Sequence, residues 1–153
     1  MNTTQKINNV ASFFKIMTSL DDIFVADAVT HAYNLSESNW ALERHAKQSA
    51  RRNYNLETSM PSEYQRTKET FLSDWPSEAT SNILFQESHV DFAVFHPQSI
   101  SVYKDGLTAL KKAKEFHQRH PNRSAPLASI DLIGMDDPLE ELTRQVEEFN
   151  PHG

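Results

Sequence analysis

Three short apolar runs, each leading towards a helical pattern, constrain this chain more than any other feature of its sequence. The runs occupy residues 23–29, 90–97 and 125–133. Each one ends in polar residues, and a segment with the helical spacing of apolar residues comes after it, which is the rhythm of consecutive β-α units. We therefore expect an α/β fold built on a parallel sheet.

Polar side chains follow the three runs. His31 comes after the first run, His96 stands before Pro97 in the second, and Asp131 lies near the end of the third. In parallel α/β folds the strands end at one edge of the sheet, where ligands and chemistry gather. The spacing therefore predicts that the three residues share one face, although each can also be explained as a polar residue at a strand exit or a loop anchor.

The connection between the first two runs is unusually long. Residues 35–76 contain a predicted helix over 38–52, whose basic cluster is typical of a solvated helix face, and a second helical pattern over 61–72. A further helix is predicted over 77–88. A βα connection of this length is uncommon unless it has a function, so we expect it to cover the strand ends as a lid.

Two more helices are predicted in the C-terminal half, over residues 104–120 and 138–149. The second begins with Asp137 as cap and proline at the first helical position. Its apolar positions are expected to face the core: Leu139, Leu142, Val146 and Phe149. Residues 151–153 read like the turn into a fourth strand, so the domain looks cut off after its third β-α unit.

Composition excludes several classes of protein. A net charge of −6 argues against a nucleic-acid-binding surface, which is usually basic. The chain has no cysteine, which excludes disulfides and thiolate metal sites and fits a cytoplasmic location. No apolar run approaches the roughly 20 residues that span a bilayer, so no membrane partner is expected.

The chain divides into two parts. Residues 1–20 are rich in Asn, Ser and Thr and are expected to be a disordered or weakly helical extension, with Met17 as an alternative start. Residues 21–153 are expected to form the folded α/β domain.

Several segments resemble the amidohydrolase-related metal-dependent hydrolases, a family that includes the aminocarboxymuconate-semialdehyde and resorcylate decarboxylases. The resemblance rests on Phe116-His117-Gln118-Arg119-His120-Pro121-Asn122-Arg123, Ala128-Ser129-Ile130-Asp131, Asp137-Pro138, Glu140-Glu141-Leu142 and Asn150-Pro151-His152-Gly153. It covers roughly residues 21–153 and implies a (β/α)₈ TIM barrel with one divalent metal, zinc or manganese, at the strand ends. This chain would supply the first three β-α units, with a helical insertion after strand 1.

The metal motif of that family matches this chain in part. The resemblance implies a metal ligand at His31, with a partner two residues earlier, where this chain has Val29. Asp27, on the same face of the strand, matches the acid that often precedes the motif and is the second predicted ligand. Later strands of the family supply the other ligands, and a zinc site normally needs three or more.

Four residues are predicted to contact a small-molecule substrate: His96, Gln98, Tyr103 and Asp131. No catalytic residue is assigned, and no Gly-x-Ser-x-Gly nucleophile motif is present. The sequence is thus interpreted as the N-terminal part of a hydrolase or decarboxylase acting on a small organic acid or cyclic compound, and we expect it to be inactive by itself. The alternatives are a stand-alone α/β interaction module, a truncated product, or a half-barrel that a second copy completes as a homo-oligomer.

Overall fold

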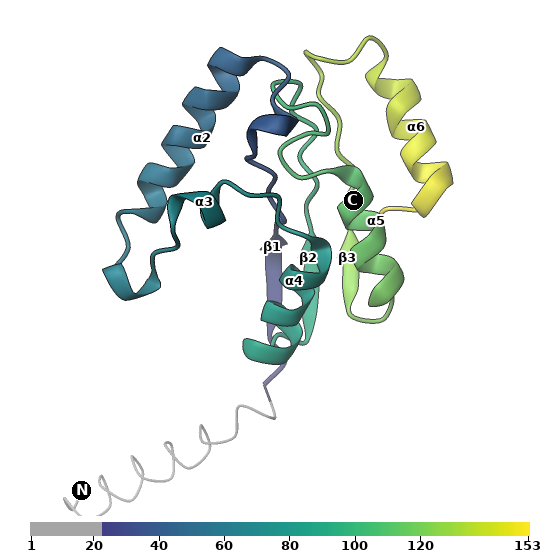
Figure 1. Ribbon diagram of the computed structural model, residues 1–153. Helices are drawn as coiled ribbons and strands as arrows, with labels where there is room; N and C mark the ends of the chain where they lie inside the picture. The colour runs from purple at the N-terminus through teal and green to yellow at the C-terminus, as the bar shows by residue number, and fades with distance from the viewer. Residues whose placement is uncertain (1–22) are drawn as a thin grey trace, which may run out of the picture.

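The computed structural model describes residues 23–153 and contains a parallel three-stranded sheet in the order β1-β2-β3. The strands are β1 (Ala26–Thr30), β2 (Phe92–Phe95) and β3 (Ser124–Pro126), and Figure 1 shows them side by side in the middle of the molecule. The predicted parallel α/β arrangement is confirmed. The expectations for residues 1–20, including a start at Met17, lie outside the described residues.

Helices connect and flank these strands. They are η2 (Glu37–Asn39), α2 (Glu43–Glu57), η3 (Ser62–Tyr64), α3 (Lys68–Phe71), α4 (Ser77–Asn82), the π-helical turn η4 (Ile83–Glu87), α5 (Leu110–Arg119) and α6 (Pro138–Phe149). Figure 1 shows α2 and α6 on opposite sides of the molecule, with the sheet between them. No helix within residues 23–153 is long and apolar enough to cross a membrane.

The main core lies between β2 and α5. Ala93 and Phe95, two residues apart and therefore on one face of β2, pack with Ala113 and Phe116 of α5, and all four are fully buried. The ring centroids of Phe95 and Phe116 are 4.9 Å apart. Burying each phenylalanine contributes about 1.5–3 kcal/mol, so this contact fixes α5 on the sheet.

A second apolar cluster attaches the long connection to the loop after β2. Ala46 and Ala50 of α2 pack with Leu35, Tyr103 and Leu107, all of them buried. The connection therefore rests on the loop 98–108 instead of on the sheet.

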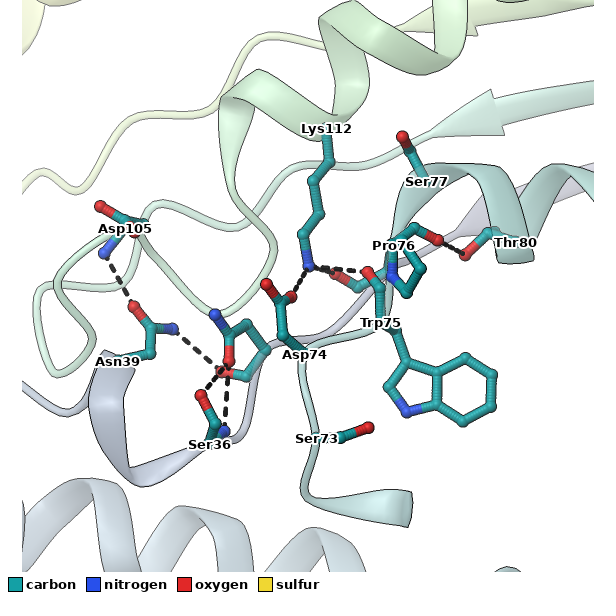
Figure 2. Close-up of polar contacts among 12 residues, drawn as sticks. Ser36, Asn39, Ser73, Asp74, Trp75, Pro76, Ser77, Thr80, Asp105 and Lys112 are labelled. Carbon is teal, nitrogen blue, oxygen red and sulfur yellow. Dashed lines mark hydrogen bonds and ion pairs between the residues drawn. The ribbon is translucent and has the colours of Figure 1, made fainter. Parts of the chain in front are cut away.

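Both ends of this connection are fastened at one point by Lys112 of α5. Its ammonium donates to the carbonyl oxygens of Ala32 at 2.9 Å and Trp75 at 2.8 Å, and it pairs with the Asp74 carboxylate. The Trp75 amide also donates to the Tyr33 carbonyl at 2.9 Å. Figure 2 shows the lysine reaching from α5 into this junction. We call residues 33–75 the excursion. These bonds hold its first and last residues together, and we call this junction the root of the excursion.

The first strand differs from the sequence prediction. The near-continuous apolar run over residues 23–29 predicts a strand buried on both faces, but Phe24 is 72% exposed and Val29 is 59% exposed. Among the described residues, β1 pairs only with β2, so its other edge has no neighbouring strand.

The third strand is shorter than predicted, because it ends at Pro126 instead of near residue 133. The prediction that Asp131 ends a strand is therefore wrong. Asp131 lies in a turn, where its Oδ1 accepts the amides of Ile133 and Gly134, both at 3.1 Å. These local bonds compete with the sheet for the backbone, which is the usual behaviour of aspartate in turns.

The helix expected from residue 104 begins at Leu110. The preceding residues instead turn back on themselves, because Gln98 and Thr108 form an antiparallel bridge. Gly106 makes the turn at φ +78°, a conformation that glycine adopts without strain.

The last helix begins as predicted, but it docks differently. Asp137 Oδ1 accepts the amides of Leu139 at 3.1 Å and Glu140 at 2.9 Å. The prediction that Leu139 and Val146 face the core is wrong, since they are 72% and 50% exposed. Gln145, fully buried, anchors α6 through the backbone of residue 129.

Candidate functional site

Two histidines meet where β1 and β2 end. The Nδ1 atom of His31 lies 2.8 Å from the His96 carbonyl oxygen, and the Nε2 atom of His96 lies 2.8 Å from the Ala28 carbonyl oxygen. A carbonyl can only accept, so each of these nitrogens carries the proton. In its neutral form His31 therefore keeps the lone pair on Nε2. Of the three residues predicted to share one face, His31 and His96 are in contact, with ring centroids 5.7 Å apart.

The surroundings of His31 favour its neutral form. The ring is half-buried and stacks on Tyr33, with centroids 5.1 Å apart and an interplanar angle of 18°. Burial lowers the pKa of His31 below its ordinary 6.5, and the hydrogen bond to His96 offsets this only in part. A neutral imidazole with a free Nε2 is the form that binds metal.

Asp27 is held on the same strand by two local donors. Its Oδ1 accepts the Val29 amide and its Oδ2 accepts the Thr30 hydroxyl, both at 3.0 Å. These bonds fix the orientation of the carboxylate, while each oxygen retains a lone pair for a further partner. Asp27 and His31 line the same cavity, so the two predicted metal ligands are brought together.

The cavity beside β1 has a volume of about 360 Å³, within the usual range for small-molecule sites. Its walls come from three parts of the chain: β1 with the residues that follow it, the excursion, and α4 with η4. The lining residues are Asp27, Val29, Thr30, His31, Tyr33, Arg66, Phe71, Trp75, Thr80, Ile83 and Leu84. The excursion thus lies against the predicted site, as a lid would.

Arg66 is the cation that the excursion brings to this cavity, and nothing in the sequence pattern singled it out. Its Nε and Nη2 atoms donate to the two carboxylate oxygens of Glu57, both at 2.7 Å. Glu57 is buried, and this pairing with Arg66 lowers the pKa of the carboxyl below 4.5. The two residues are nine positions apart across a turn and a 3-10 helix, a spacing that no helix or strand period predicts.

The remaining predicted substrate residues lie elsewhere. Tyr103 and Asp131 line a second cavity of about 490 Å³ between the loop after β2 and the start of α6. Asp131 accepts the Ser101 amide at 2.8 Å, and this bond, with those from Gly134 and Ile133, lowers its pKa to about 2. Its observed role is thus that of a loop anchor.

Two of the predicted substrate residues carry buried polar atoms. The side-chain oxygens of Gln98 and Tyr103 are buried and have no hydrogen-bond partner within residues 23–153. Neither residue lines the cavity that contains His31. His96 does not line that cavity either, although its ring contacts the His31 ring, so none of the four predicted substrate residues lies in the cavity that contains His31.

The fit of these residues to a metal ion is partial. His31 has the orientation of a metal ligand, because a ligating histidine usually donates its other N–H to a carbonyl or carboxylate. Asp27 supplies a second candidate ligand, a carboxylate that would bind through oxygen. Within the described part of the chain, no group of three or more His, Asp or Glu side chains is placed to hold a metal.

Comparisons of the chain with protein-family models, with curated proteins and with solved structures find no match. A functional assignment therefore depends on the geometry above and on the sequence motifs.

Proposed function

We propose that this chain is the N-terminal part of a metal-dependent hydrolase or decarboxylase of amidohydrolase type, acting on a small organic acid or cyclic compound. The observation that carries the proposal is the setting of His31 at the end of β1. Its Nδ1 donates to the His96 carbonyl, its Nε2 is left for a ligand, and Asp27 lines the same cavity. This is how a ligating histidine is oriented in protein metal sites.

Exposed apolar side chains on β1 and on α6 support a larger barrel. Val29 on β1 and Leu139 on α6 are 59% and 72% exposed. Further strands and helices of a (β/α)₈ barrel would cover such groups and leave no open sheet edge. After α6, the His152 amide donates to the Pro126 carbonyl of β3 at 2.9 Å, so residues that follow α6 return to the sheet.

The residues of this chain would hold part of the metal site. His31 would bind zinc or manganese through Nε2, and Asp27 would contribute a carboxylate oxygen. The metal would activate water or polarise a substrate carboxylate or carbonyl. As the resemblance implies, later strands would supply the other ligands. A cytoplasmic location belongs to the same proposal, because a chain without cysteine suits a reducing compartment.

Metal binding by the metal-free chain tests this proposal. Zinc or manganese is titrated into the wild type, His31→Ala and His45→Ala, the last being a matched control on the exposed face of α2. We expect the wild type to bind metal weakly, since a zinc site normally needs about three ligands. The binding should be lost in His31→Ala and kept in His45→Ala. Equal binding by the wild type and His31→Ala, or no binding at millimolar metal, would contradict the proposal.

A half-barrel that a second copy completes is the alternative, and the open edge of β1 favours it. Ile23 and Phe24, just before β1, are 47% and 72% exposed, and an apolar unpaired edge promotes association. The mass of the chain in solution separates the two readings. A dimer of defined size would favour the half-barrel, whereas a monomer or an irregular aggregate would favour a part of a larger enzyme.

A further inference from the structure

We propose that Arg66 recognises the carboxylate of an apolar organic acid in the cavity beside β1. This inference rests on the proposed function in one respect, since the same cavity holds His31 and Asp27. It adds the residue that selects an acid and the part of the fold that delivers it. Arg66 belongs to the excursion, between η3 and α3, and not to the sheet.

The guanidinium of Arg66 is held in advance by one carboxylate. Besides the two side-chain bonds to Glu57, the Arg66 amide donates to Glu57 Oε1 at 2.9 Å. Glu57 is only 4% exposed, so this anchor is itself fixed at the end of α2. A preorganised donor loses little freedom when it binds a ligand, which favours affinity.

Two aromatic rings fix the guanidinium from other directions. The Arg66 Cζ atom lies 5.0 Å from the Phe71 ring centroid and 4.8 Å from the Trp75 ring centroid. Both rings also line the cavity, and the Trp75 indole N–H is held by the Thr70 carbonyl at 3.2 Å. With Nε and Nη2 on Glu57, Nη1 has no protein acceptor within residues 23–153. The guanidinium therefore keeps an edge for a ligand.

The rest of the cavity suits an apolar body with one acidic group. Most of the lining side chains are apolar or aromatic: Val29, Tyr33, Phe71, Trp75, Ile83 and Leu84. Arg66 is the only lysine or arginine among the lining residues. Asp27 is the one carboxylate among the lining residues, and its two oxygens accept from the Val29 amide and the Thr30 hydroxyl. Guanidinium groups bind carboxylates more strongly than neutral acceptors, so a carboxylate is the preferred partner for Nη1.

A matched acid and amide test the inference on the metal-free chain. Phenylacetate and phenylacetamide have the same apolar body, and calorimetry gives a Kd for each. We expect the wild type to bind the acid about ten-fold more tightly than the amide, as charge-assisted hydrogen bonds are stronger. Arg66→Met should bring this ratio to about one by weakening the acid alone. Arg52→Met, a control on the exposed face of α2, should leave the ratio as in the wild type.

Glu57→Gln gives a second readout that keeps Arg66, in case Arg66→Met does not fold. A glutamine side chain has only one acceptor oxygen, so it cannot hold both Nε and Nη2 of Arg66; the guanidinium loses its preorganised position, and the acid-to-amide ratio should fall. An acid-to-amide ratio near one in the wild type, absence of binding, or a ratio unchanged in both Arg66→Met and Glu57→Gln would overturn the inference. If Arg66→Met does not fold, an unchanged or higher ratio in Glu57→Gln overturns it. Metal binding that depends on His31, without acid selection, would support the proposed function and overturn the role of Arg66. Acid selection without metal binding would support the role of Arg66 and contradict the proposed function.

Discussion

Replacing Lys112 with methionine should loosen the root of the excursion. Methionine keeps an unbranched apolar side chain but removes the ammonium that joins the Ala32 and Trp75 carbonyls. The lysine side chain is only 11% exposed, so water replaces these bonds poorly. The change therefore tests whether one buried cation holds together the two ends of a segment of more than forty residues.

The expected loss in the free energy of unfolding follows from the two carbonyls and the carboxylate that lose the Lys112 ammonium. Each buried carbonyl that loses its donor costs about 1–3 kcal/mol. Asp74 is 56% exposed, so its ion pair with Lys112 adds at most about 1 kcal/mol. Allowing for some hydration of the opened site, we expect a loss of about 2–4 kcal/mol in the free energy of unfolding, a large share of the 5–15 kcal/mol typical of a domain.

Urea denaturation followed by circular dichroism measures this loss. Lys111→Met is the matched control, because Lys111 is 83% exposed and its pair with Glu115 spans 3.7 Å. That control should change stability by less than about 0.5 kcal/mol. Hydrogen exchange at the Trp75 amide, which donates to the Tyr33 carbonyl, should also accelerate in Lys112→Met. A Lys112→Met chain as stable as the control would refute the reasoning.

Three further predictions concern the loops and His31. Gly106→Ala should lower stability by about 1–3 kcal/mol in urea unfolding, because φ is +78° and a Cβ would lie 2.4 Å from the Gln98 carbonyl oxygen. Gln145→Leu should cost about 2–4 kcal/mol in the same assay and release α6, since the buried amide accepts from the Ser129 N–H and donates to the Ser129 carbonyl. Burial lowers the folded pKa of His31 below 6.5, so its contribution to stability is present above 6.5 and is lost as pH falls through the folded pKa. Unfolding measured from about pH 7 to pH 5 should therefore show a shallower loss of stability in His31→Ala, and an equal slope would argue against a buried ring.

The sheet could be predicted because its strands are local features of the sequence. Near-continuous apolar runs flanked by charge identified β1 and β2, and the cap at Asp137 identified α6. The length of the third strand could not be predicted in this way. Residues 127–133 are as apolar as a strand, but the hydrogen bonds of Asp131 within its own turn remove them from the sheet.

The start of α5 was misplaced for a tertiary reason. Leu107 fits the helical spacing, yet it is buried against the excursion before the helix begins. The bridge between Gln98 and Thr108 decides the path of the chain there, and such pairings leave no periodic signal.

The candidate site was predictable only in its β1 part. The position of His31 after an apolar run selected it as a polar residue at a strand exit, and the family resemblance implied its ligand role. The resemblance also implied the role of Asp27, which the two-residue period of a strand puts on the same face. Arg66 could not be selected, because its role depends on a carboxylate and two rings that only the folded excursion brings together.

The tautomer of His31 and its response to zinc test the central claim most directly. Nitrogen-15 NMR of the histidine rings distinguishes a protonated Nδ1 from a protonated Nε2 in the neutral side chain. The account predicts that His31 carries its proton on Nδ1, donated to the His96 carbonyl, and that added zinc shifts its Nε2 resonance while His45 is unchanged. A proton on Nε2 of His31, or a His31 ring that does not respond to zinc, would contradict the assignment of this residue as a metal ligand.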